Sequence, residues 1–120
     1  MPLPTGFVFV DDPRTFATGD ARAVFVSHRI HKKRELFGSL KRQLGFPDHF
    51  GWNWDALNDC LHEIVEPIAI IHDGLPFGEQ SQSRRIYLEL LRGLVESDSS
   101  LWTIVFPSDV RNIVLANGGP

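Results

Sequence analysis

Three acidic residues are spaced at four-residue intervals in one short segment of the chain: Asp55, Asp59 and Glu63. In a helix, each step of four residues turns only about 40° further around the axis, so the three carboxylates would form one stripe over about 12 Å. Like charges at this spacing repel, and no cation in the segment offsets them. A carboxylate stripe can bind cationic side chains of a partner. Acidic stripes are also often plain solvated faces, and Asp55 near a helix start is favourable with the helix dipole.

The same segment carries residue types that catalysis or metal binding can use. Asp55, Asp59, His62 and Glu63 place carboxylates and an imidazole one to two helical turns apart, where such groups can converge. This spacing is not diagnostic, because His62 lies about 60° to 100° around the helix from its acidic neighbours. The chain has no His-Glu-x-x-His motif, phosphate-binding loop or Gly-x-Ser-x-Gly elbow to complete an active site. We therefore expect no enzymatic activity, metal or cofactor.

Charge is unevenly distributed along the chain, although the net charge is only −3. Residues 28–34 form a basic cluster, which can contact nucleic acid but is more commonly the solvated start of a helix. We expect no direct binding of nucleic acid. Residues 43–83 contain no Lys or Arg, and their acids predict an anionic surface that attracts a basic protein. These acids are Asp48, Asp55, Asp59, Glu63, Glu66, Asp73 and Glu79.

A helix over residues 53–64 would present the acidic stripe. Asn53 fits the N-cap position, after a chain reversal that Gly51 permits. Cys60 lies beside the apolar side of this helix without cationic neighbours, so we expect a packed thiol rather than a nucleophile. The apolar residues recur at intervals of three and four and would bury the opposite face. They are Trp54, Leu57, Leu61 and Ile64.

Short β-branched or aromatic runs alternate with helical patterns along the rest of the chain. Strands are predicted at residues 7–10, 23–26, 67–71 and 101–106. Further helices are predicted at residues 32–44, which Gly45 stops, and 83–96. The tail, 109–120, would add a short helix or an edge strand. This order indicates an α/β fold in which right-handed crossovers join parallel strands.

Length and composition predict one domain over residues 1–120. A chain of 120 residues with 42% hydrophobic and 22% charged residues can bury a core without crosslinks. Its single cysteine forbids an internal disulfide. No segment approaches the roughly 20 apolar residues of a membrane span, and the first residues lack the basic region of a signal peptide. We therefore expect a cytoplasmic protein.

One ungapped run resembles the signature of the barstar family, the intracellular inhibitors of small basic ribonucleases. It reads Phe46-Pro-Asp-His-Phe-Gly-Trp-Asn-Trp-Asp-Ala-Leu-Asn-Asp-Cys-Leu61. The order of elements over residues 23–106 also agrees with that family. The resemblance implies a three-layer α/β fold with a small three-stranded parallel sheet packed with helices. Residues 7–10 would be an additional N-terminal edge strand.

The resemblance also implies a site. In this family the helix and the loop before it enter the active-site cleft of the ribonuclease, so Asp55 and Asp59 would bind the cations that normally hold substrate phosphates. Glu63 extends the acidic stripe. His49 stands where tyrosine is frequent and Asn58 where an aromatic residue is common. Further partner contacts are expected from His49, Gly51, Trp52 and Asn58, with Trp52 compensating for the missing aromatic residues.

Four further residues lie in the motif or on the later helix predicted at 83–96. By position, Phe50 is expected in the core and Asn53 at the cap. An acid on the later helix contacts the nuclease in some relatives; Glu89 and Glu96 are only candidates for it.

The resulting hypothesis is an inhibitor that occludes the active site of a small basic ribonuclease, in an immunity-type role. The alternative is a regulatory or scaffolding module that binds another basic protein through the same acidic face without inhibiting it.

Overall fold

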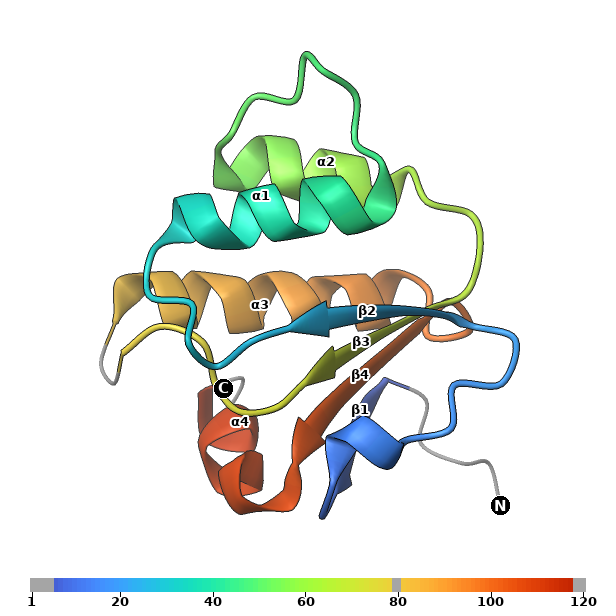
Figure 1. Ribbon diagram of the computed structural model, residues 1–120, viewed down its shortest axis with the longest axis vertical. Helices are drawn as coiled ribbons and strands as arrows, with labels where there is room; N and C mark the ends of the chain where they lie inside the picture. Colours follow the sequence, from blue (N-terminus) through green and yellow to red (C-terminus); the bar gives the residue numbers. More distant parts are fainter. Residues whose placement is uncertain (1–5, 79–80, 118–120) are drawn as a thin grey trace.

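A parallel β-sheet of four strands organises the molecule, as the computed structural model shows for residues 6–78 and 81–117 (Figure 1). The strand order is β1-β4-β3-β2. Every neighbouring pair is parallel, so each connection between neighbours crosses over one face of the sheet. The strands are β1 (Phe7–Val10), β2 (Arg22–Val26), β3 (Ile68–His72) and β4 (Trp102–Pro107).

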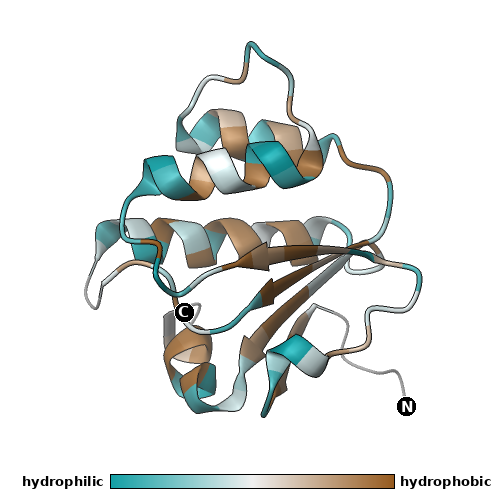
Figure 2. Ribbon diagram, viewed as in Figure 1, coloured by the Kyte–Doolittle hydropathy of each residue, from teal (hydrophilic) through white to brown (hydrophobic). Residues whose placement is uncertain are grey.

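Helices and side chains of one sheet face enclose the main core. Side chains alternate along each strand, so Val24, Ile70, Ile104 and Phe106 point to the same face and are fully buried there. Figure 2 shows the strands as mainly apolar and the helices as amphipathic, which is the pattern of a sheet covered by helices. The α-helices are α1 (Lys33–Leu44), α2 (Trp54–His62), α3 (Gln82–Ser97) and α4 (Arg111–Asn117).

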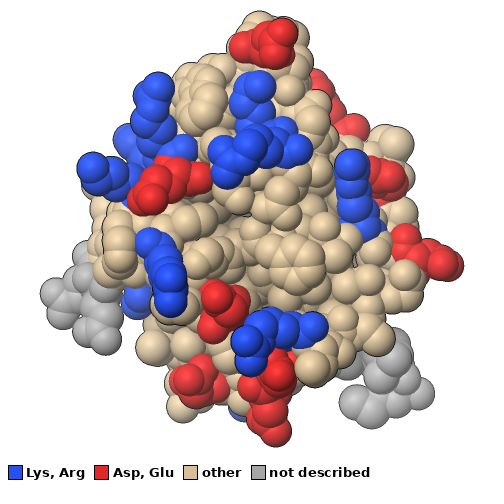
Figure 3. Space-filling view, viewed as in Figure 1, with Lys and Arg blue, Asp and Glu red and all other residues tan. Residues whose placement is uncertain are grey.

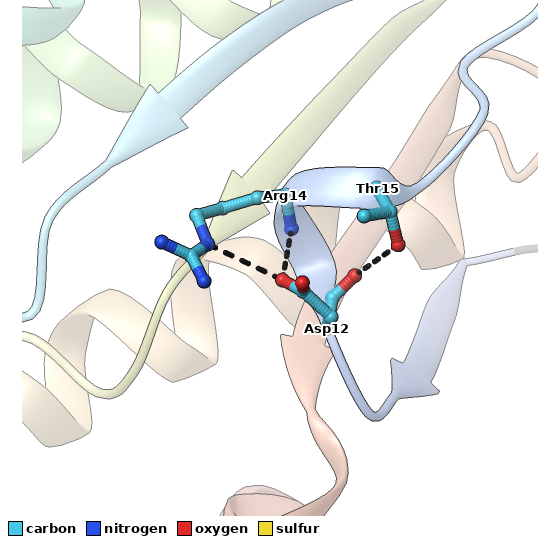
Figure 4. A network of polar contacts seen from close by, with 3 residues as sticks. All are labelled: Asp12, Arg14 and Thr15. Atoms are coloured by element: carbon cyan, nitrogen blue, oxygen red, sulfur yellow. Dashed lines mark hydrogen bonds and ion pairs between the residues drawn. The ribbon is translucent and has the colours of Figure 1, made fainter.

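The opposite face of the sheet is covered by the connection between β1 and β2. This connection contains the short 3-10 helix η1 (Pro13–Thr15) and contributes Phe16 to a second, smaller cluster with Ala69, Ile71 and Val105. Figure 4 shows how Asp12 begins η1: its carboxylate accepts a hydrogen bond from the Arg14 backbone N–H at 3.1 Å. Helices, sheet and this irregular segment make three layers.

The structure confirms the predicted fold class. The N-terminal segment is an edge strand, in which Phe7 pairs with Ile104 of β4. The predicted helix at 32–44 is present, and Gly45 ends it in the left-handed conformation at φ 70° that glycine adopts without strain. The tail forms a second 3-10 helix, η2 (Ser108–Val110), and α4 rather than an edge strand; residues 118–120 lie outside the described residues.

The helix that carries the acidic stripe is shorter than predicted. α2 ends at His62 rather than at residue 64, and Glu63 is its C-cap. Ile64 lies beyond the helix and still packs against the core. The regular spacing of apolar residues therefore indicated correctly that Ile64 contacts the core, but incorrectly that the helix extends to it. In the described part of the chain, no helix is long and apolar enough to cross a membrane.

Candidate protein-binding site

The loop before α2 is tied to the first turn of the helix. Asn53 is the N-cap, as predicted: its side-chain oxygen accepts from the Ala56 backbone N–H at 2.8 Å, and its amide nitrogen donates to the Gly51 carbonyl at 3.2 Å. A Cβ on Gly51 would lie 3.2 Å from the Cβ of Ala56, closer than most such contacts. Gly51 therefore lets the loop approach the helix, which fixes residues 49–53 relative to α2.

Burial of one face of α2 leaves the acidic stripe outside. Leu57 and Leu61 are fully buried, which orients the helix on the core. Asp55, Asp59 and Glu63 are exposed. Among the residues that the structure describes, none of these three carboxylates forms a salt bridge. Their oxygens are therefore available to cations of another molecule.

A hollow of about 210 Å³ lies between the loop and α2. Its position brings four of the predicted site residues together, since His49 and Gly51 line it from the loop and Asp59 and Glu63 from the helix. Phe50 is buried, as expected, and also lines the hollow. An apolar wall beside two carboxylates suits a cationic group with a flat or aliphatic body. The complete lining is Pro47, His49, Phe50, Gly51, Ala56, Asp59, Cys60 and Glu63.

Cys60 faces this hollow but is not set up as a nucleophile. Burial, together with the negative charges of Glu63 and Asp59, raises the pKa of the Cys60 thiol. A raised pKa keeps the sulfur protonated at neutral pH, and the protonated form reacts slowly. The packed, inert thiol expected from the sequence agrees with this environment.

The remaining predicted residues surround the hollow without lining it. Asp55 lies one turn before Asp59, and Asn58 is half-buried. Trp52 is 38% exposed and lies at the edge of the loop, 5.7 Å from Phe50 between ring centroids. The candidate surface therefore consists of a hollow at its centre with Asp55 and Trp52 at its margin.

The acid–base cluster considered from the sequence does not form around His62. The Nδ1 of His62 lies 2.8 Å from the Asn58 carbonyl, which can only accept, so the ring donates to its own helix backbone. Over the described residues, no group of three or more His, Cys, Asp or Glu side chains is placed to hold a metal ion. Glu89 and Glu96 are exposed on α3, and neither lines the hollow.

Larger depressions, with volumes of about 470, 750 and 400 Å³, lie at the carboxyl edge of the sheet. Two of the acids that line these depressions, Glu35 and Asp73, have partners within the molecule. Glu35 accepts from the backbone N–H groups of His31 and Lys32, and these hydrogen bonds lower its pKa. Burial acts to raise the pKa of Asp73, but hydrogen bonds from the backbone and ring of His28 outweigh it and lower the pKa. Asp11 and Asp109 also line the depressions of 750 and 400 Å³, whereas the stripe of three carboxylates and the loop hollow occur together at α2.

An exposed acidic helix beside a small hollow, on an α/β scaffold, is chemically suited to a basic partner. The chain belongs to the barstar family, since a model of that family, described as Barstar (barnase inhibitor), matches residues 22–104. A search of curated proteins found no match. Proteins of this family are inhibitors rather than enzymes, and membership supports a role as a ribonuclease inhibitor of the barnase-inhibitor type. β1, η1 and α4 lie outside the matched residues.

Proposed function

We propose that this protein inhibits a small basic ribonuclease by inserting α2 and the preceding loop into the active-site cleft. Asp55 and Asp59 bind the cationic side chains that otherwise hold substrate phosphates, and a cationic group of the nuclease enters the hollow between His49 and Asp59. The observation that carries the proposal is the row of exposed carboxylates on α2, which have no cation within the described part of the chain. Inhibition is then by occlusion.

The physical chemistry of the site supports this mode of binding. Charge-assisted hydrogen bonds between carboxylates and guanidinium groups are short and roughly twice as strong as neutral ones. The capped helix and the loop tied through Asn53 hold the carboxylates in place before binding, which reduces the ordering that association costs. In this proposal, residues 1–120 act as one domain in the cytoplasm, a reducing compartment that suits a chain with the single cysteine Cys60.

Inhibition assays with a panel of small basic microbial ribonucleases, barnase included, test the proposal. The wild type is expected to inhibit at least one of them, and Asp55→Asn/Asp59→Asn is expected to weaken that inhibition by about a hundredfold or more, since truncating buried charge pairs costs several kcal/mol. Asp11→Asn/Asp20→Asn is the matched control, because it removes the same charge from exposed sites away from α2.

Two results would contradict the proposal. Full inhibition by the α2 variant would move the site elsewhere on the molecule. Binding of the ribonucleases without inhibition would favour the alternative, a regulatory or scaffolding module that uses the same face.

A further inference from the structure

The acidic face of α2 is bordered by a cation that α1 supplies. The guanidinium carbon of Arg34, in the first turn of α1, lies 5.2 Å from the centre of the Trp52 ring. Figure 1 shows that α1 and α2 begin at the same end of the molecule, so residues 18 positions apart in the sequence meet there. Neither spacing nor periodicity along the chain could indicate this pair.

Trp52 is held in place by its backbone and by three contacts. Its φ of 52° lies in the left-handed region, which a bulky residue adopts only where the surroundings impose it. The indole lies over α1 at Gly38, with ring atoms 3.6 and 3.7 Å from the position that a Cβ would take. Phe50 packs against it on another side, at 5.7 Å. The ring is therefore a fixed platform, and Arg34 covers part of it.

The charge around this platform is positive on the α1 side. Lys32, Lys33 and Arg34 are all exposed, and Arg34 forms no salt bridge with any described residue. Figure 3 shows Lys and Arg side chains gathered over the start of α1. Asp55 follows Trp52 by only three residues. The surface therefore changes sign across Trp52, from the carboxylates of α2 to the cations of α1.

We propose that Trp52 and Arg34 extend the partner-binding surface onto α1 and select a ribonuclease that carries a carboxylate beside its basic cleft. This inference rests on the proposed function. When Asp55 and Asp59 enter the cleft, Arg34 faces the rim of the nuclease, where an acidic side chain pairs with it. A rim that is basic throughout is repelled by Arg34 and its neighbours, so the pair discriminates among nucleases that would all accept the acidic helix.

The test compares Arg34→Ala, Arg34→Glu and Trp52→Ala with the wild type, using the ribonuclease from the panel that the wild type inhibits most strongly. Arg34→Glu is expected to weaken inhibition about tenfold or more, because it places like charges opposite each other, and Arg34→Ala should weaken it less. Trp52→Ala should resemble Arg34→Ala, since it removes the platform, and Trp52→Phe should restore most of the loss. Arg85→Glu, an exposed cation on α3, is the matched control.

A second measurement separates pairing with the partner from damage to the fold. In this measurement, each acidic residue around the cleft of the nuclease is replaced by lysine in turn. One of these nuclease variants should be inhibited better by the Arg34→Glu protein than the unchanged nuclease is, and should be inhibited less well by the wild-type protein. If the Asp55→Asn/Asp59→Asn variant loses inhibition while Arg34→Glu inhibits as well as or better than the wild type, the inference is overturned and the proposed function stands. If the wild type inhibits no ribonuclease, the proposed function fails and this inference fails with it.

Discussion

A buried histidine couples the stability of the protein to pH. His72 at the end of β3 is fully buried, and its ring stacks on Phe106 at 4.0 Å. Its Nδ1 lies 2.9 Å from the Val105 carbonyl and its Nε2 lies 2.7 Å from the Tyr87 hydroxyl. Because the carbonyl can only accept, Nδ1 carries the proton, and Nε2 accepts from Tyr87. Protonation of Nε2 would turn it into a donor and take away the acceptor of the Tyr87 hydroxyl proton, so this arrangement fits the neutral ring.

This arrangement predicts that acid destabilises the protein before its carboxylates titrate. Burial lowers the pKa of His72 from 6.5 to about 4. Between these values the unfolded chain binds a proton that the folded chain does not, so stability is lost as the pH falls through this window. The loss between pH 7 and pH 5 should be about 2 kcal/mol. Urea unfolding at both pH values measures it.

His72→Gln should lose this pH dependence, because glutamine stays neutral, whereas His31→Gln, at an exposed histidine, should keep it. NMR titration of the His72 imidazole ring in the wild type measures the pKa directly, without any substitution that could alter the fold. A His72 ring that titrates near pH 6.5 in the folded protein would refute the prediction.

At the scale of elements, α1 protects the open edge of the sheet. β2 is an edge strand, and the Gln43 side chain binds its backbone from α1 as a neighbouring strand would. The Phe25 N–H donates to the Gln43 amide oxygen at 2.8 Å, and the Gln43 amide nitrogen donates to the Phe25 carbonyl at 2.7 Å. Unpaired edges invite strand addition from other chains, so this pair also opposes association.

Gln43→Glu tests this edge protection with almost no change in shape. A carboxylate accepts from the Phe25 N–H but meets the Phe25 carbonyl with a lone pair, so one bond is lost and a repulsion is gained. We expect a loss of about 1 to 2 kcal/mol at neutral pH in urea unfolding, and faster hydrogen exchange at the Phe25 amide, because the repulsion at the Phe25 carbonyl pushes the side chain away from the strand. Ser39→Ala, which removes only the third contact of the Gln43 amide, should change little. Unchanged exchange at Phe25 in Gln43→Glu would show that the edge needs no such partner.

The ends of helices could be predicted from the sequence where residues close together in the chain determine them. Gly45 ends α1 and Asn53 begins α2 because a left-handed residue and a side-chain cap are properties of a few neighbouring positions. The contacts of Gln43 with Phe25 and of Arg34 with Trp52 were not predictable. Each joins residues 18 positions apart that only the packing of α1 against its neighbours brings together. The acidic stripe was visible in the sequence, but the hollow beside it was not, because its walls come from both the loop and the helix.

At the scale of the whole molecule, the distribution of charge over the surface matters more for the approach of a charged partner than the net charge does. A net charge of −3 is small, yet the carboxylates of α2 form no salt bridge with any residue that the structure describes, while Lys and Arg gather over the start of α1 (Figure 3). In the proposed complex, a basic partner is therefore attracted in one orientation, in which the acidic face leads. Such steering raises the rate of association and weakens when salt shortens the reach of exposed charges, from about 10 Å at 0.1 M to about 3 Å at 1 M.

The association rate with the inhibited ribonuclease should therefore fall steeply with added salt, while the dissociation rate should change much less. Stopped-flow measurements over this range of salt give both rates. Asp55→Asn/Asp59→Asn should flatten the salt dependence of association, because it removes the charges that lead the approach. Asp11→Asn/Asp20→Asn should leave the slope close to that of the wild type, although the net charge changes equally. Equal slopes for the two variants would mean that net charge, rather than the acidic face of α2, guides the encounter.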